Sequence, residues 1–261
     1  LSLSLSLSLS LSLSLSFPYT NVISNIPTTL HYQVPSNYDT DVFRSLFIEI
    51  EKLTGGTYKY GGKYDDEDKD MVDSSFRVIS DHIRCLTVMI HDGVLPGNKG
   101  RHHMVRRILR RCVFFGKTKL SINQPEGWLY RLVPTVMESI GRRQQHEEEE
   151  EEVGEDSFYL GEEMKLDSQR TESIMKVIQE EEMKFEKTWE KGRRKYEKEV
   201  SGMKPGETIP GSLVWFLHET YGIYVDIVEV LCLERGLRVD RKGFEESFEK
   251  GRSGGGGSSG S

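Results

Sequence analysis

The sequence predicts an all-α protein, an irregular helical bundle flanked and interrupted by segments of low complexity. Over most of the chain apolar residues recur every three or four positions, the period of a helix that buries one face. Ser, Asp or Pro precedes several of these segments and Gly follows them, as at helix ends. No convincing strand pattern lies between Asn37 and Lys250, so we expect the folded part to contain helices alone.

Four segments fall outside the predicted bundle, which we assign to residues 37–250. Residues 1–16 are a Leu-Ser repeat of the kind that a CT dinucleotide repeat encodes, and residues 17–36 are expected to form a loosely ordered leader. Residues 142–163 include six consecutive glutamates, whose mutual repulsion predicts a disordered acidic insertion. Residues 251–261 form a Gly/Ser tail.

The first half of the bundle is predicted to hold four helices. Asp39 is expected to cap the first, which a Gly-Gly pair ends, and Ser74 or Ser75 is expected to cap the second. The third is expected to end at Gly116, and Pro125 to open the fourth. The residues predicted to be buried are Phe43, Leu46, Phe47, Ile50 and Leu53; Phe76, Ile79, Ile83, Leu86 and Ile90; Val105, Ile108, Leu109 and Cys112; and Trp128, Leu129, Leu132, Val133, Val136 and Ile140.

The second half begins with a long charged helix over 168–200. A short helix is predicted to start at Pro210, another to be capped by Asp226, and a last one to be capped by Asp240. The residues predicted to be buried are Ile174, Val177, Ile178, Phe185, Trp189 and Tyr196; Leu213, Val214, Phe216 and Leu217; Ile227, Val230 and Leu231; and Phe244 and Phe248.

The composition argues against disulfide-rich, zinc-binding and membrane-spanning proteins. The cysteines, Cys85, Cys112 and Cys232, are scattered and form no CxxC pair, so a reducing compartment is the default. No apolar run approaches the ~20 residues of a membrane span. Residues 1–16 lack the basic start of a signal peptide and the arginines of a transit peptide. We therefore expect the cytoplasm, with an organelle as the alternative.

The third predicted helix carries an unusual concentration of positive charge. Arg106, Arg107, Arg110 and Arg111, called here the arginine quartet, lie on the side of the helix away from its apolar residues. No Asp or Glu occurs from residue 93 to 125, although the formal net charge of the chain is -7. A polyphosphate such as RNA would suit an all-cationic face, because neutralised phosphates release counterions. The alternative is a face that is simply solvated.

At these residues the sequence resembles the alanyl-tRNA synthetase family. The resemblance is to the helical domain that follows the class II catalytic core and recognises the acceptor stem, and it extends from about Ser36 to Phe244. It implies binding to the acceptor stem of tRNA(Ala), with no DNA or membrane partner. The stretches with the strongest similarity are Phe76–Arg84, Asp92-Gly93, Pro96–Arg101 and Val105–Arg111.

The resemblance also implies which residues recognise the G·U wobble pair of that stem. The Asn of the family's Pro-x-Asn turn corresponds to Asn98, and the Asp of its Tyr-Asp-Thr-Tyr-Gly motif corresponds to Glu219, which keeps the charge with one more methylene. Lys99, Arg101 and the arginine quartet would bind the phosphates. Taken alone, Asn98 would be a turn or cap residue and Glu219 an exposed helix residue.

No catalytic residue is expected in this chain. The family's phosphate-binding arginine motif falls where residues 19–35 have neither Arg nor Lys, and the first arginine is Arg44. ATP, Mg²⁺ and alanine are implied for the full-length family only, and we expect no cofactor in this chain. No metal site is predicted either, because the adjacent His102 and His103 do not share a helix face.

Three hypotheses for function remain open at this stage. The chain is an acceptor-stem-binding domain without catalysis of its own, or part of a longer, active alanine-tRNA ligase. The third is an inert or protein-binding helical remnant, with the glutamates and the long charged helix as its interaction surface. The oligomeric state is not determined by the sequence.

Overall fold

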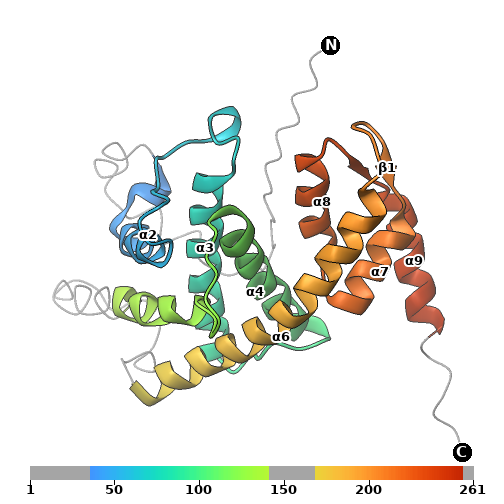
Figure 1. Ribbon diagram of the computed structural model, residues 1–261. Helices are drawn as coiled ribbons and strands as arrows, with labels where there is room; N and C mark the ends of the chain where they lie inside the picture. The colour runs from blue at the N-terminus through green and yellow to red at the C-terminus, as the bar shows by residue number, and fades with distance from the viewer. Residues whose placement is uncertain (1–35, 141–167, 255–261) are drawn as a thin grey trace, which may run out of the picture. The chain divides into compact units, whose positions relative to one another are not determined.

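The structure, a computed structural model, describes residues 36–140 and 168–254 and is predominantly helical (Figure 1), as the sequence predicts. The chain divides into two compact units, Leu1–Thr40 and Asp41–Ser261. Of the first unit, the structure describes the 3-10 helix η3 (Asn37–Asp39), which the side chain of Ser36 caps. The predictions for the Leu-Ser repeat, most of the leader, the acidic insertion and the end of the tail lie outside the described residues.

The second unit begins with α2 (Asp41–Leu53) and α3 (Val72–His91), which pack together through fully buried apolar residues. Asp39 lies within η3, and the residue directly before α2 is Thr40. Neither Ser74 nor Ser75 caps α3, because the helix begins before them. The cap comes from Asp68, whose carboxylate accepts hydrogen bonds from the backbone N–H groups of Asp73 (3.0 Å) and Ser74 (2.6 Å).

α4 (Gly100–Lys119) lies along α3 and contains Gly116, which was predicted to end it. The structure gives this glycine another role: a Cβ at this position would lie 2.1 Å from Cζ2 of Trp128. The indole of Trp128 is fully buried, so the helix has a glycine here because an aromatic ring packs directly on its backbone.

The segment after α4 does not begin a helix at Pro125. It forms a turn, the 3-10 helix η5 (Leu129–Leu132) and then a helix over 133–140. The start of η5 is held by Glu182, whose carboxylate accepts the N–H groups of Trp128 (3.0 Å) and Leu129 (3.1 Å). A long-range cap of this kind cannot be recognised from the local sequence.

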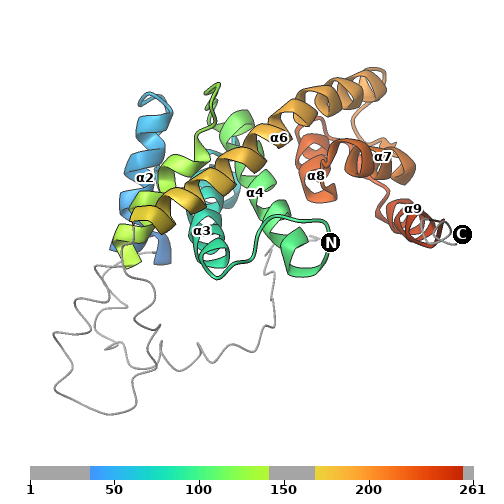
Figure 2. The ribbon, with the colours of Figure 1, turned by 90° about the horizontal axis from the view of Figure 1, so that it is seen from below.

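α6 (Ser168–Val200) has the predicted bounds and connects the two ends of the unit. It contacts α3, α4 and η5 along its first part and α7 farther on. Figures 1 and 2 show it crossing α3 and α4 on its way to α7 and α8. Its buried apolar residues are Ile174, Ile178, Phe185, Trp189, Tyr196 and Val200.

The last part contains α7 (Gly211–Tyr221), α8 (Val225–Glu234) and α9 (Arg241–Gly254). Asp240 caps α9 as predicted, accepting the N–H of Gly243 at 2.9 Å, and α9 continues into the segment predicted as tail. Asp226 lies in the first turn of α8 and not at its N-cap, which is Tyr224.

Two short strands lie within this predominantly helical fold, where the sequence shows no convincing strand pattern. β1 (Thr208–Ile209) and β2 (Arg238–Val239) form a parallel pair that joins the segments before α7 and α9. Each strand has two residues, too few for a period-two pattern in the sequence.

Several residues predicted to be buried are partly exposed. The prediction is wrong for Phe216, which has 40% of its surface exposed. The half-buried ones are Phe43, Leu53, Ile108, Ile140, Val177, Leu213, Val230, Leu231, Phe244 and Phe248.

Candidate nucleic-acid interface

The arginine quartet does not form the open cationic face that the sequence predicts. Its side chains are only 22% (Arg106), 33% (Arg107), 14% (Arg110) and 17% (Arg111) exposed, and all four form ion pairs with carboxylates. The prediction of an unneutralised cationic face on this helix is therefore wrong. The carboxylates come from α6 and α8.

Arg106 and Arg110 share Glu181 of α6. Nε of Arg106 and Nη2 of Arg110 each lie 2.9 Å from Oε1 of Glu181, and Nε of Arg110 donates to the same oxygen at 3.2 Å. The Glu181 side chain is 5% exposed, so two guanidinium groups neutralise a buried carboxylate.

Arg107 and Arg111 share Asp226 of α8. Nη1 of Arg111 donates to Oδ2 at 2.6 Å, and Nη2 of Arg107 lies 3.3 Å from Oδ1. Together with the Glu181 pairs, these contacts connect α4 to two helices far along the chain. The arginine quartet therefore holds α4, α6 and α8 together. Its acidic partners, Glu181 and Asp226, are distant in sequence and could not be recognised from the residues around the arginines.

Asn98 lies exposed in the turn between α3 and α4. Its side-chain oxygen accepts a hydrogen bond from Nη1 of Arg106, which holds the amide in place. The neighbouring Lys99 and Arg101 are exposed, and neither forms an ion pair with any residue that the structure describes. The turn therefore keeps two available cations beside an oriented amide.

Glu219 is exposed in the last turn of α7. That helix ends at Gly222, which has a φ of +67° and whose carbonyl accepts a hydrogen bond from Nη1 of Arg110 at 3.2 Å. A Cβ at Gly222 would lie 1.7 Å from the same Nη1, so only glycine fits here. The end of α7 is thus attached to α4 a few residues after Glu219.

Aromatic contacts join the same two helix ends. The ring centroid of Tyr224 lies 5.3 Å from that of His103 in α4 and 5.1 Å from that of His218 in α7. Burial and the positive charges of His103, Arg107 and Arg110 lower the pKa of His218 to about 4, so this imidazole is neutral near pH 7.

The structure therefore brings the surroundings of Asn98 and Glu219 together. Arg106 holds Asn98, Arg110 holds the carbonyl at the end of α7, and Glu181 bridges the two arginines. Of the residues that form this junction, the sequence indicated neither Glu181 nor the Tyr224 contacts.

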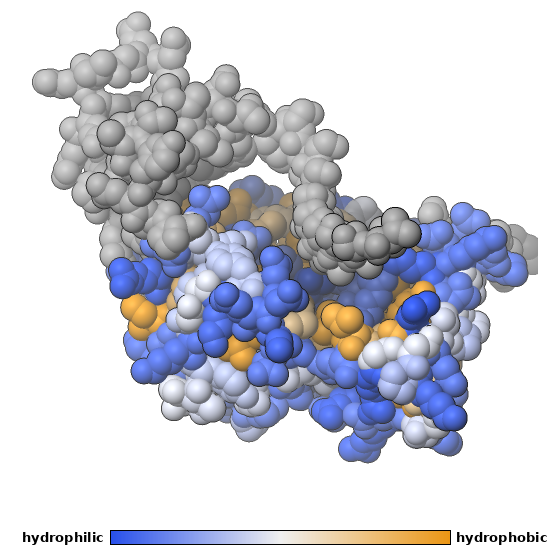
Figure 3. Space-filling view, turned by 90° about the horizontal axis from the view of Figure 1, so that it is seen from above, coloured by the Kyte–Doolittle hydropathy of each residue, from blue (hydrophilic) through white to orange (hydrophobic). Residues whose placement is uncertain are grey.

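The described residues contain no group of three or more His, Cys, Asp or Glu residues placed to hold a metal ion, and no helix among them is long and apolar enough to cross a membrane. His102 and His103 have different partners, since Nδ1 of His102 lies 2.8 Å from the carbonyl oxygen of Leu95. The face in Figure 3 is mainly hydrophilic over the described residues.

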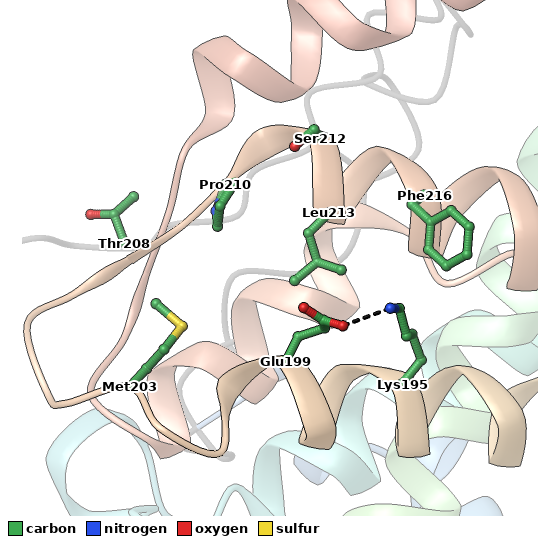
Figure 4. Close-up of a pocket in the computed structure, with 8 residues that line it drawn as sticks. All are labelled: Lys195, Glu199, Met203, Thr208, Pro210, Ser212, Leu213 and Phe216. Atoms are coloured by element: carbon green, nitrogen blue, oxygen red, sulfur yellow. Dashed lines mark hydrogen bonds and ion pairs between the residues drawn. The ribbon is translucent and has the colours of Figure 1, made fainter.

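An open groove of about 560 Å³ lies between the end of α6, β1 and α7 (Figure 4). Lys195 and Glu199 form an ion pair of 2.6 Å on one side, and Phe216 and Leu213 of α7 lie across from them. None of the predicted RNA-binding residues lines it. Its lining residues are Lys195, Glu199, Met203, Thr208, Pro210, Ser212, Leu213 and Phe216.

Comparison with known proteins gives a consistent result. The family of class II (A) tRNA synthetases matches residues 26–255. The chain is 39% identical to the cytoplasmic alanine–tRNA ligase of Bombyx mori over 212 residues, covering 81% of this chain and 20% of the relative. It is 36% identical to the mitochondrial alanine–tRNA ligase of Saccharomyces cerevisiae over 229 residues, covering 85% and 21%.

A bacterial relative matches equally well. The alanine–tRNA ligase of Streptococcus mutans is 36% identical over 217 residues, covering 82% of this chain and 21% of the relative. The chain thus spans about a fifth of the length of the curated relatives that it matches.

Proposed function

The chain belongs to the class II (A) tRNA synthetase family, and from this premise we propose that its helical unit binds the acceptor stem of tRNA(Ala) as part of an alanine–tRNA ligase. Support comes from the relatives, which are named alanine–tRNA ligases and include cytoplasmic and mitochondrial proteins. It also comes from the family's wobble-pair residues, which correspond here to Asn98 and Glu219.

The observation on which the proposal depends is the junction between the start of α4 and the end of α7. Asn98 and Glu219 are both exposed, and a continuous network of ion pairs and hydrogen bonds connects their surroundings. Asn98 is held by Arg106, and the helix end that carries Glu219 is attached to Arg110, so the two positions can act on one ligand.

The chemistry of the two side chains suits a wobble pair. An RNA helix exposes its minor groove, where the 2-amino group of a guanine in a G·U pair remains free. The Glu219 carboxylate can accept from that amino group. Because Arg106 donates to Oδ1 of Asn98, the amide nitrogen is the group left to donate to a base.

In this proposal the arginine quartet positions the junction and does not bind phosphates. The phosphate contacts belong to Lys99 and Arg101, the exposed cations of the turn, which lie next to Asn98 in the chain. A phosphate beside Asn98 would fix the register of the stem, while Asn98 and Glu219 supply the base contacts.

The test is binding to two acceptor hairpins that differ only in having a G·U or a G·C pair at the recognised position. We expect the wild-type chain to prefer the wobble hairpin, and Asn98→Ala and Glu219→Gln each to reduce that preference by roughly 5- to 150-fold, or about 1–3 kcal/mol. Lys99→Ala should weaken binding to both hairpins alike.

Glu246→Gln is a suitable control, because it removes the same charge as Glu219→Gln from an exposed position of α9 that belongs neither to the junction nor to the groove. Equal affinity of the wild-type chain for both hairpins would contradict the proposed specificity. A preference that survives both substitutions would exclude these two residues as its source.

A further inference from the structure

The outward face of α6 carries a second concentration of positive charge, which the sequence analysis did not single out. Lys187, Lys191, Arg194 and Lys198, called here the α6 cation row, follow one another at spacings of four, three and four residues. At 100° per residue they fall within roughly 60° of the helix circumference and extend over about 16 Å. All four are exposed, and none forms an ion pair with a residue that the structure describes.

The carboxylates beside the row do not neutralise it, because each already has another cation. Glu186 and Glu190 pair with Lys117 at 3.5 Å and 3.3 Å, Glu197 pairs with Arg193 at 2.9 Å, and Glu199 pairs with Lys195 at 2.6 Å. The row thus retains its charge in a chain that is acidic overall. This is the opposite of the arginine quartet, whose charge is neutralised within the fold.

The row is also separate from the junction of α4 and α7. Phe185, Trp189 and Tyr196, the buried residues of this half of α6, lie on the opposite side of the helix. Glu181, through which α6 contacts the arginines, belongs to that buried side as well. A ligand on the row would therefore not be part of the acceptor-stem contacts described above.

The groove of Figure 4 lies beside the row, because Lys195 and Glu199 line it from neighbouring positions of the same helix. Phe216 forms one end of it with 40% of its surface exposed, and Nζ of Lys195 lies 5.6 Å from the centroid of its ring. The volume of about 560 Å³ is enough for a nucleobase with its sugar. An exposed aromatic ring next to a line of cations is the combination that single-stranded nucleic acids require.

We propose that an unpaired RNA strand binds along α6, with its phosphates on the α6 cation row and one base in the groove against Phe216. The inference takes from the proposed function only that RNA is the polyanion concerned. The Glu199 carboxylate in the groove accepts a hydrogen bond from an exocyclic amino or imino group of the base. Its negative charge disfavours a phosphate in the groove, so the base lies in the groove and the phosphate on the α6 cation row.

The test uses the intact chain and a fluorescein-labelled dodecauridine, which contains neither a stem nor a wobble pair. Binding is followed by anisotropy over a series of salt concentrations. Replacing the α6 cation row by alanines should reduce the slope of log K against log salt by about 3, since each phosphate neutralised on a single strand contributes roughly 0.7.

The matched control for this variant removes the same charge elsewhere. In the control variant four other lysines are replaced by alanine. These lysines are exposed and form no ion pair with a described residue, so the salt slope of the control variant should equal that of the wild type. They are Lys59, Lys63, Lys69 and Lys242.

Phe216→Ala should weaken binding of the dodecauridine by roughly 5- to 150-fold, the loss expected for one stacked base, and leave the salt slope and the affinity for an RNA duplex unchanged. Leu233→Ala removes an apolar side chain that is 67% exposed on α8 and should change neither. Circular dichroism checks that each variant keeps its helices.

The proposal is overturned if the row variant keeps the wild-type slope, if Phe216→Ala keeps the wild-type affinity, or if the wild-type chain binds no single-stranded RNA at low salt. A hexaglutamate peptide bound as tightly as the RNA would also overturn it, and would assign the row to an acidic protein partner. The acceptor-hairpin test stands apart: equal affinity of the wild-type chain for the two hairpins contradicts the proposed function and leaves the dodecauridine result intact.

Discussion

At the scale of single residues, the buried carboxyl group of Glu182 holds a turn in place, but its ionisation costs stability. Its side chain is fully buried, and its carboxylate accepts the N–H groups that begin η5. Burial raises the pKa of Glu182 from 4.5 to about 7, although the hydrogen bonds from Trp128 and Leu129 act in the opposite direction. The folded protein therefore keeps a proton on this carboxyl that the unfolded chain has already lost.

This predicts a pH dependence of stability with a definite sign. Because the pKa is higher in the folded protein, the contribution of Glu182 is fully present below about pH 4.5 and is lost as the pH rises through about 7. Glu182→Gln keeps an acceptor for the two N–H groups but cannot ionise. We expect the free energy of unfolding of the wild type, relative to this variant, to fall by about 2–3 kcal/mol between pH 5 and pH 8.

Urea unfolding of both proteins at the two pH values measures this difference. Glu180→Gln serves as the control, because Glu180 lies near Glu182 on the same helix but its carboxylate is 56% exposed. A constant difference between wild type and Glu182→Gln across the pH range would contradict the expectation.

At the scale of secondary-structure elements, the arginine quartet makes α4 the helix on which α6 and α8 are assembled. Two carboxylates, each shared by two guanidinium groups, tie elements that are far apart in the chain. Partly buried pairs of this kind are costly to break from one side, because the remaining charge has no partner. The contacts therefore determine how α4 is oriented more than they add to stability.

Glu181→Ala should consequently destabilise the fold, by about 2–4 kcal/mol after allowing for the remaining exposure of Arg106 and Arg110. Glu180→Ala is the matched control, since its carboxylate is 56% exposed and lies 3.9 Å from Lys184. That variant should change the free energy of unfolding by less than about 0.5 kcal/mol. Equal values for the two variants in urea titrations would show that Arg106 and Arg110 do not depend on Glu181.

At the scale of the whole molecule, the chain corresponds to about a fifth of the ligases that it resembles. The four arginines of the quartet are paired with carboxylates within the fold, so their charges are already neutralised. We propose that activation of alanine depends on residues other than those described and that this chain contributes RNA recognition.

ATP–pyrophosphate exchange in the presence of alanine tests that division of roles. The chain by itself should give no exchange above the background without protein, while it binds the acceptor hairpin in the same buffer. Alanine-dependent exchange by the chain alone would contradict the proposal. Exchange without hairpin binding would reverse the assignment altogether.

Much of the fold could be predicted because helices with one apolar face repeat in the sequence. The bounds of α6 and the buried faces of α3 and α4 follow from this period alone. Several of the errors share a cause, since each involves a partner outside the local helical pattern. Trp128 explains Gly116, Asp68 and Glu182 replace the expected caps, and two short segments pair as β1 and β2.

The candidate site follows the same division. Asn98 and Glu219, which the family resemblance implies, are exposed at one junction, whereas the arginine quartet, assigned to phosphates from the resemblance and from its local pattern, is paired within the fold. Within 93–125 the arginines have no acidic neighbour, and only the packing of α6 and α8 against α4 brings Glu181 and Asp226 to them.

The sequence by itself determined the helical class, the family and the identity of the charged residues. Only the tertiary structure decided which of those charges are neutralised and which remain available to a ligand. The physical reason is that amphipathic periodicity is a local property of the chain, whereas the electrostatic state of a side chain depends on every element packed around it. For this protein, that difference removes the arginine quartet from the set of available cations and leaves Lys99, Arg101 and the α6 cation row.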